Sequence, residues 1–225
     1  MNKTWQLVLG VAVVAIAFGL FVRFIYQPRA EEATATTRMD QRLRASARYY
    51  DEPLGFVPDF EFDAHTGERF SKDELNNKVF VADFFFTQCD AACPMMSSNM
   101  SRVQKAFATE EDFKIVSFSL DPAKDDIQAL ARYASAFEAI DGSWYFLRGE
   151  RDEIYDLGMK GFMQAMVWNE GVVDHSEKFI LVDRNGGIRG FYQGTDTKEV
   201  GQLINDVRYL LRKEKRMQRE QASTN

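Results

Sequence analysis

Short β-favouring runs alternate with helical stretches between residues 79 and 147, and this alternation limits the possible folds more than any other feature of the chain. Residues 79–86 (VFVADFFF) are mostly apolar, as expected of a strand buried on both faces. Residues 94–107 then carry apolar side chains at spacings of i, i+4, i+7 and i+11, which predicts a helix. A second strand is predicted over 113–120. Because a helix joins them, the two strands should be parallel, with a right-handed crossover.

Two hairpins flank this alternating pattern. Residues 60–62 and 68–70 surround a turn that contains Gly67, and residues 178–182 and 188–192 surround a turn that contains Asn185-Gly186. The remaining predicted elements are a helix over 127–137, a strand over 144–147, a short helix over 151–157 and an amphipathic helix over 200–211. We therefore predict an α/β fold: a thioredoxin-like mixed sheet with helices on both faces, preceded by an N-terminal transmembrane helix.

The N-terminal segment differs in character from the rest of the chain. Residues 7–22 contain no charged or strongly polar side chain, and Trp5 and Tyr26 bracket them as interfacial aromatics do. With these flanks the run nearly reaches the roughly 20 residues that span a bilayer. We predict an anchor over 1–26, with a cleaved signal or a buried helix as alternatives, and a soluble domain outside the cytoplasm on the periplasmic side or its equivalent.

The rest of the chain divides into three predicted parts. Residues 27–52 form a predicted tether with little apolar periodicity. Residues 53–212 are predicted to form a single α/β domain, and residues 213–225 a polar tail that frays. The formal net charge of −6 and a pI near 5.1 argue against a nucleic-acid partner. Two Cys and two His exclude a disulfide scaffold and several zinc sites.

Both cysteines lie between the predicted strand 79–86 and the helix that follows it, where α/β sheets commonly bind ligands. Cys89 and Cys93 have the spacing C-x-x-x-C. Pro94 suits the first position of a helix, which predicts Cys93 at the N-cap with a pKa lowered by the helix dipole. A soft-metal chelate, thiol redox chemistry and a structural disulfide all remain open for this pair, although a short closed loop gains little stability from a crosslink.

One of the two histidines is placed to join the cysteines. His65 lies in a predicted turn and is expected to be solvated, whereas His175 precedes the strand 178–182. In a thioredoxin-like layout, the loop before that strand faces the cysteines. Two thiolates with one imidazole suit Cu(I) and can also hold Cu(II) or Zn(II). Asp174 would then be either a partner that orients the imidazole or an ordinary turn carboxylate.

Methionines and an Asp-Pro pair stand close to this region of the sequence. Met96 and Met100 have the helical spacing of core residues, and Met95 is left open as a thioether near the site. Asp121-Pro122 ends the second strand, where we expect a polar turn.

The chain resembles the Sco/SenC family. The resemblance rests on Cys89-x-x-x-Cys93-Pro94, on Ser119-Leu120-Asp121-Pro122 with Asp125, and on Asp174-His175-Ser176 followed by residues 179–183. It implies a copper ion, Cu(I) or Cu(II), bound by Cys89, Cys93 and His175. It also implies a membrane-anchored, thioredoxin-like domain that delivers copper or reducing equivalents to the copper A subunit of cytochrome c oxidase. Many members have Pro where this chain has Asp90, and Asp-Thr-Pro where it has Asp125-Asp126-Ile127. These differences bear on the choice of partner or the tuning of the site more than on copper binding.

Our first hypothesis is therefore a membrane-tethered copper chaperone of the respiratory chain rather than an enzyme. A thiol reductant must keep Cys89 and Cys93 reduced, since thiolates are the ligands. The alternative is a membrane-tethered thiol–disulfide oxidoreductase in which the same two cysteines are the redox-active pair. A peroxiredoxin-like peroxidase is disfavoured, because no Arg motif lies near the cysteines.

Overall fold

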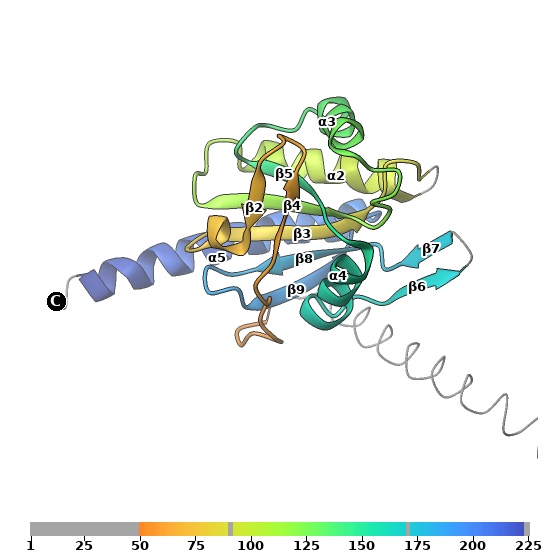
Figure 1. The fold of residues 1–225 in the computed structure, drawn as a ribbon. Helices are drawn as coiled ribbons and strands as arrows, with labels where there is room; N and C mark the ends of the chain where they lie inside the picture. Colours follow the sequence, from red (N-terminus) through yellow and green to blue (C-terminus); the bar gives the residue numbers. More distant parts are fainter. Residues whose placement is uncertain (1–49, 90–91, 170–171, 223–225) are drawn as a thin grey trace, which may run out of the picture. The chain divides into compact units, whose positions relative to one another are not determined.

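A computed structural model describes residues 50–89, 92–169 and 172–222. Seven strands form one mixed sheet in the order β2-β1-β5-β4-β3-β8-β9 (Figure 1). Their bounds are β1 Glu61–Ala64, β2 Arg69–Ser71, β3 Val79–Phe85, β4 Phe113–Ser119, β5 Trp144–Arg148, β8 Lys178–Val182 and β9 Ile188–Gln193. Strands β3, β4 and β5 run parallel, and the outer pairs are antiparallel.

The central pair β3–β4 determines where the cysteines emerge. The two strands pair in register from Val79 opposite Phe113 to Phe85 opposite Ser119. Their carboxyl ends therefore finish side by side at one edge of the sheet, and the segments that follow each strand begin there. This is the edge at which the sequence places Cys89, Cys93 and Asp121.

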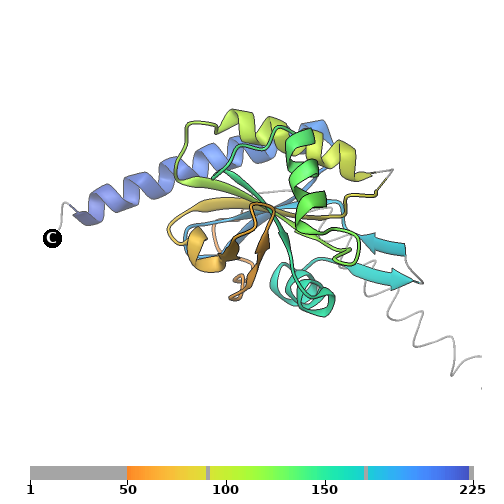
Figure 2. The same ribbon diagram turned by 45° about the horizontal axis from the view of Figure 1, so that its top comes forward.

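Helices cover both faces of the sheet (Figure 2). The three longer helices are α2 Ala92–Ala106, α3 Ile127–Ala136 and α5 Thr197–Ala222, and they pack on one face. The shorter α4 Arg151–Asp156 runs into the π-helical turn η2 Leu157–Gly161, which lies toward the other face. A 3-10 turn, η1 Lys72–Leu75, follows β2, and the Ser71 side chain caps it.

Successive side chains of β3 point to opposite faces of the sheet, so this strand contributes to the hydrophobic core on both sides. Val81 and Phe85 belong to the core cluster under α2 and α5, together with Met96 and Met100. Phe84 points the other way, and its ring centroid lies 5.6 Å from that of Phe162, just after η2. All residues of β3 are buried, so the prediction of a strand enclosed on both faces is confirmed.

The predicted fold class is confirmed as a thioredoxin-like mixed sheet with helices on both faces. Within the described residues no helix is long and apolar enough to cross a membrane, and the apolar run 7–22 lies outside those residues. The proposed anchor therefore remains a prediction.

Two features differ from the predicted elements. Helix α5 continues to Ala222, past the point where fraying was expected. Ion pairs explain part of the extension, because Glu214 meets Arg184 at 2.8 Å and Lys215 meets Glu110 at 2.8 Å. A second, two-stranded sheet, β6 Met166–Asn169 and β7 Val172–His175, occupies the segment predicted as a loop before β8.

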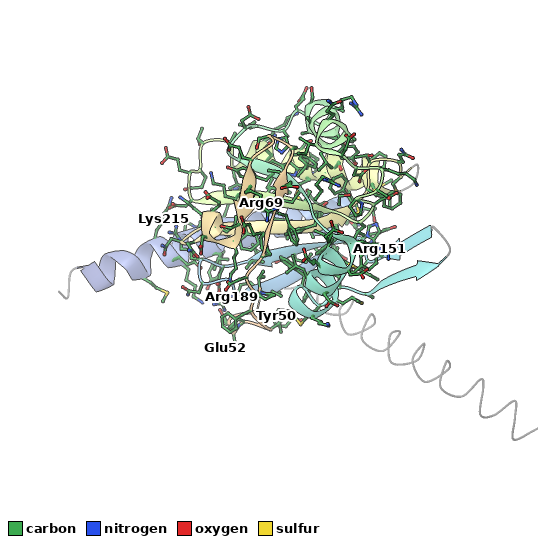
Figure 3. The ribbon with its side chains drawn as sticks, in the orientation of Figure 1. Tyr50, Glu52, Arg69, Arg151, Arg189 and Lys215 are labelled. Atoms are coloured by element: carbon green, nitrogen blue, oxygen red, sulfur yellow. The ribbon has the colours of Figure 1, made fainter. Side chains whose placement is uncertain are left out.

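The described chain begins against the edge strand β9. The backbone N–H of Tyr50 donates to the carbonyl oxygen of Arg189 at 2.7 Å, and Arg189 also forms an ion pair of 2.5 Å with Asp183. Figure 3 labels Tyr50 and Arg189 in this region of the molecule. Asp183 is buried and also accepts the backbone N–H of Gly187, so the ion pair stabilises the β8–β9 turn. The Arg189 side chain also donates to the carbonyl oxygen of Asp51, which joins this hairpin to the start of the described chain.

Candidate metal and redox site

Cys89 lies on the connection from β3 to α2, and Cys93 lies in the first turn of α2. The N–H of Cys89 donates to the carbonyl oxygen of Phe86 at 3.3 Å, which closes a turn directly after the strand. The N–H of Cys93 donates to Sγ of Cys89 at 3.4 Å. Both are free thiols; Cys89 is half-buried and Cys93 is fully buried. The prediction that the two cysteines lie where a buried strand is followed by a helix is confirmed, whereas Asp90 lies outside the described residues.

The predicted N-cap position of Cys93 is wrong. The chain is already helical at Ala92, so Cys93 and Pro94 belong to the first turn of α2. The expected lowering of the Cys93 pKa is also wrong, because burial raises the pKa of this thiol and a hydrogen bond with Cys89 adds to the effect. The first-turn N–H of Cys93 donates instead to the sulfur of Cys89.

A buried carboxyl group lies on the same face of the sheet as Cys93. Asp83 is fully enclosed within β3 and accepts a hydrogen bond of 2.5 Å from the hydroxyl of Ser117 on β4. The indole N–H of Trp144 donates to the same hydroxyl at 2.9 Å. Burial raises the pKa of Asp83 to about 7, partly offset by the Ser117 hydrogen bond. Asp83 was not among the predicted site residues, although a lone Asp within the apolar run VFVADFFF is a visible signal of a special position.

His175 lies at the end of β7, next to the aromatic residue that anchors the cysteine turn. Its ring is edge-on to the ring of Phe86, with 6.1 Å between centroids. Its Nδ1 lies 3.1 Å from the carbonyl oxygen of Ser176. Because a carbonyl oxygen only accepts hydrogen bonds, this contact requires a proton on Nδ1. A backbone carbonyl that fixes the tautomer in this way is common for histidines that bind metals.

The described residues contain no group of three His, Cys, Asp or Glu side chains arranged to hold a metal ion. The assignment of Cys89, Cys93 and His175 as ligands therefore stays a prediction. The donor types suit a soft ion, since two sulfurs and one imidazole are the ligands that Cu(I) prefers. Asp174 belongs to β7, but its side chain lies outside the described part of the molecule.

The other sequence-predicted residues near the site are now placed. Met96 and Met100 are fully buried core residues, as predicted, whereas Met95 is 53% exposed on the first turn of α2. Asp121 forms the expected turn: its carbonyl oxygen accepts the N–H groups of Lys124 at 3.0 Å and of Asp125 at 2.9 Å.

The prediction for His65 is wrong. This residue is buried, its ring is edge-on to that of Phe146, and its Nδ1 accepts the N–H of Phe146 at 3.3 Å. Burial lowers the pKa of His65, opposed by the charge of Asp141. A short turn can fold its side chain back onto the adjacent strand, and the sequence of the turn alone does not reveal this.

Comparison with known proteins connects this geometry to a family. Residues 49–212 match the family model described as SCO1/SenC. The SCO1 protein homolog of Bacillus subtilis (strain 168) is 33% identical over 162 residues, a match that covers 70% of this chain and 84% of that protein. The chain belongs to the SCO1/SenC family.

Solved structures agree with this assignment. A SCO1/SenC family lipoprotein from Bacillus anthracis is 32% identical with a TM-score of 0.67, over 72% of this chain and 98% of that one. BsSco, described as a member of the Sco family of cytochrome c oxidase assembly proteins with a disulfide switch, is 33% identical with a TM-score of 0.64, over 72% and 96%. Arabidopsis thaliana ScoI was solved with copper bound; at 21% identity and a TM-score of 0.58, over 69% and 99%, it shows likeness of fold alone.

Proposed function

We propose that this Sco/SenC protein binds copper through Cys89, Cys93 and His175. In this proposal it delivers the metal, or reduces the acceptor thiols, during assembly of the copper A centre of cytochrome c oxidase. The proposal extends to this chain the copper and the oxidase-assembly role that are stated for its relatives. Copper is the cargo of such a protein, and the acceptor is the copper A subunit.

One observation carries the proposal: the N–H of Cys93 donates to Sγ of Cys89 at the start of α2, and the ring of His175 packs against Phe86, which closes the Cys89 turn. The contact between Phe86 and His175 supports a site that would draw its donors from two distant parts of the sequence. A structural disulfide would not need an imidazole nearby. An inert buried thiol pair would not leave Cys89 half-exposed at the edge of the sheet.

Redox state would control loading. Cys93 must lose its proton to become a ligand, and burial, which raises its pKa, makes that loss depend on the incoming cation. Oxidation of Cys89 and Cys93 to a disulfide would remove both thiolates at once. A thiol reductant is therefore part of the proposed cycle.

Membrane attachment is part of the same proposal. The apolar run 7–22 would anchor the chain, with the Cys–His site outside the cytoplasm. Relatives support this location, since one of them is a lipoprotein.

The second candidate function is a tethered thiol–disulfide oxidoreductase. The hydrogen bond from the N–H of Cys93 to Cys89 Sγ favours it, because it holds the two cysteines side by side while Cys89 stays half-exposed to a partner. In such a reaction one thiolate attacks a partner disulfide, and the second cysteine then displaces the partner thiol as its own disulfide forms.

Copper titration of the full chain, reduced and then oxidised, tests the first function. We expect one equivalent of Cu(I) bound only by the reduced protein. His175→Ala should weaken binding by at least the roughly tenfold to hundredfold that loss of an outer-shell partner costs, since it removes a direct ligand. His65→Gln, which removes the other histidine, is the matched control and should bind like the parent.

The outcomes separate the two functions. If His175→Ala holds copper as tightly as the parent, the ligand assignment is wrong. If the reduced parent binds no stoichiometric copper yet reduces a protein disulfide, the oxidoreductase is the correct function.

A further inference from the structure

A fully buried carboxylate outside the proposed ligand set lies next to the cysteine turn. Asp125 follows the β4–α3 turn and directly precedes Asp126, the N-cap of α3. Its exposed fraction is 0%. A carboxylate enclosed to this degree needs several hydrogen-bond donors, and the identity of those donors shows what it holds in place.

The donors to Asp125 come from the ends of two parallel strands. The backbone N–H of Thr87 donates to Oδ2 at 3.1 Å, and the Thr87 hydroxyl donates to Oδ1 at 2.5 Å. The hydroxyl of Ser119, the last residue of β4, donates to Oδ2 at 2.5 Å. One side chain from the start of α3 thus ties together the segments that leave β3 and β4.

Thr87 is a central residue of the turn that places Cys89. The hydrogen bond from Cys89 to Phe86 closes the turn and leaves the N–H of Thr87 without a role inside it. Asp125 accepts that N–H as well as the hydroxyl, so it fixes the turn by both backbone and side chain. The turn in turn brings Sγ of Cys89 to the N–H of Cys93.

We propose that Asp125 is a positioning residue for the Cys89–Cys93 pair, acting through Thr87 to hold the first sulfur beside the second. The inference rests on the proposed function only in taking these two cysteines as the working site. Among the described residues, the hydrogen bonds of Asp125 go to Thr87 and Ser119 and to neither sulfur, so its effect is on the distance and approach of Cys89. Its carboxylate has no part in the chemistry itself.

The consequence is measurable without copper. In glutathione buffer the two thiols form one disulfide, two electrons pass to oxidised glutathione, and two reduced glutathiones take up the two protons. The equilibrium constant depends on how closely the protein holds the two sulfurs together. Asp125→Ala removes all three acceptor contacts and should lower this constant about tenfold, which raises the midpoint potential by about 30 mV.

Three further variants grade the effect. Asp125→Asn keeps one acceptor oxygen and should lower the constant by less, about threefold. Thr87→Val removes only the hydroxyl contact and should resemble it, whereas Thr87→Ser keeps both donors and should match the parent. Asp126→Ala is the matched control: it removes a carboxylate from the neighbouring residue and the cap to Ala129, but no contact with the cysteine turn.

The measurement is redox titration of the full chain, with free thiols counted by alkylation, together with denaturant unfolding of each reduced variant. Additivity gives a further check, because Asp125→Ala and Thr87→Val sever the same contact and the double variant should shift no further than Asp125→Ala alone. If Asp125→Ala fails to fold, Thr87→Val and Asp125→Asn carry the test.

The inference is overturned if these variants lose stability yet keep a dithiol–disulfide constant within twofold of Asp126→Ala, since that is the behaviour of a purely structural carboxylate. Copper binding is read separately. A parent that binds no copper overturns the proposed function and leaves the redox comparison intact.

Discussion

The backbone N–H of Cys93, in the first turn of α2, donates a hydrogen bond to the sulfur of Cys89, 3.4 Å away. The two thiols consequently have different surroundings. Cys89 is half-buried at the edge of the sheet, while Cys93 is fully buried and its pKa is raised by burial. The C-x-x-x-C spacing alone gives no reason for this asymmetry.

Differential alkylation should reveal the asymmetry. In the native reduced protein at pH 8, we expect iodoacetamide to modify Cys89 at least about tenfold faster than Cys93, because only thiolates react and the buried thiol keeps its proton. Peptide mass spectrometry after timed quenching measures both rates. In denaturant the two rates should converge, and a native Cys93 as reactive as Cys89 would contradict the structure.

Asp83 should make the protein less stable as the pH rises from about 4 to about 7. Its pKa is raised from 3.8 to about 7, so within this range the folded state keeps a proton that the unfolded state has lost. Asp83→Asn removes that dependence and should be more stable than the parent at pH 8 by on the order of a few kcal/mol. Urea unfolding at pH 5 and pH 8 measures the difference.

Asp152→Asn is the control for this prediction, because Asp152 is 92% exposed in its side chain. It should change stability little at either pH. A parent and an Asp83→Asn variant with the same pH profile would show that Asp83 is ionised in the folded protein at pH 5.

His65 should destabilise the fold on acidification. Because burial lowers its folded-state pKa below 6.5, the unfolded state binds a proton first as the pH falls, and stability drops below about pH 6.5. An NMR titration of the ring should give a midpoint under 6.5. A midpoint at or above that value would mean that the ring is solvated, as its turn position suggested.

Two glycines should respond to alanine in opposite directions. A Cβ at Gly149 would lie 2.2 Å from Cδ1 of the buried Phe62 ring, so Gly149→Ala should cost about 1–3 kcal/mol. A Cβ at Gly201, inside α5, meets nothing within 4 Å, so Gly201→Ala should stabilise by about 0.5–1 kcal/mol. Thermal unfolding of the two variants against the parent checks both signs.

Periodicity and turn residues predicted most of the architecture. The run VFVADFFF became a strand buried on both faces, and Asn185-Gly186 became the β8–β9 turn. These elements are specified by patterns within ten or so residues. The prediction placed a loop carrying His175 where the hairpin β6–β7 lies, although Met166-Val167-Trp168 and Val172-Val173 are β-favouring.

The site was predictable in its residue types and less so in its environment. Sequence position brought Cys89 and Cys93 to the correct edge of the sheet, since strand ends follow from the strand pattern. The raised pKa of Cys93, the buried carboxyl of Asp83 and the contacts of Asp125 all depend on packing between elements far apart in the sequence. No local pattern encodes such contacts.

The in-register pairing of β3 with β4 determines when the cysteine site can form during folding. Thr87, Ser119 and Asp125 come together only after Phe85 lies opposite Ser119. The arrangement of the two sulfurs is thus a product of tertiary folding and is absent from a newly made, extended polypeptide. Metal binding by the two sulfurs in their native arrangement must therefore come after the domain has folded.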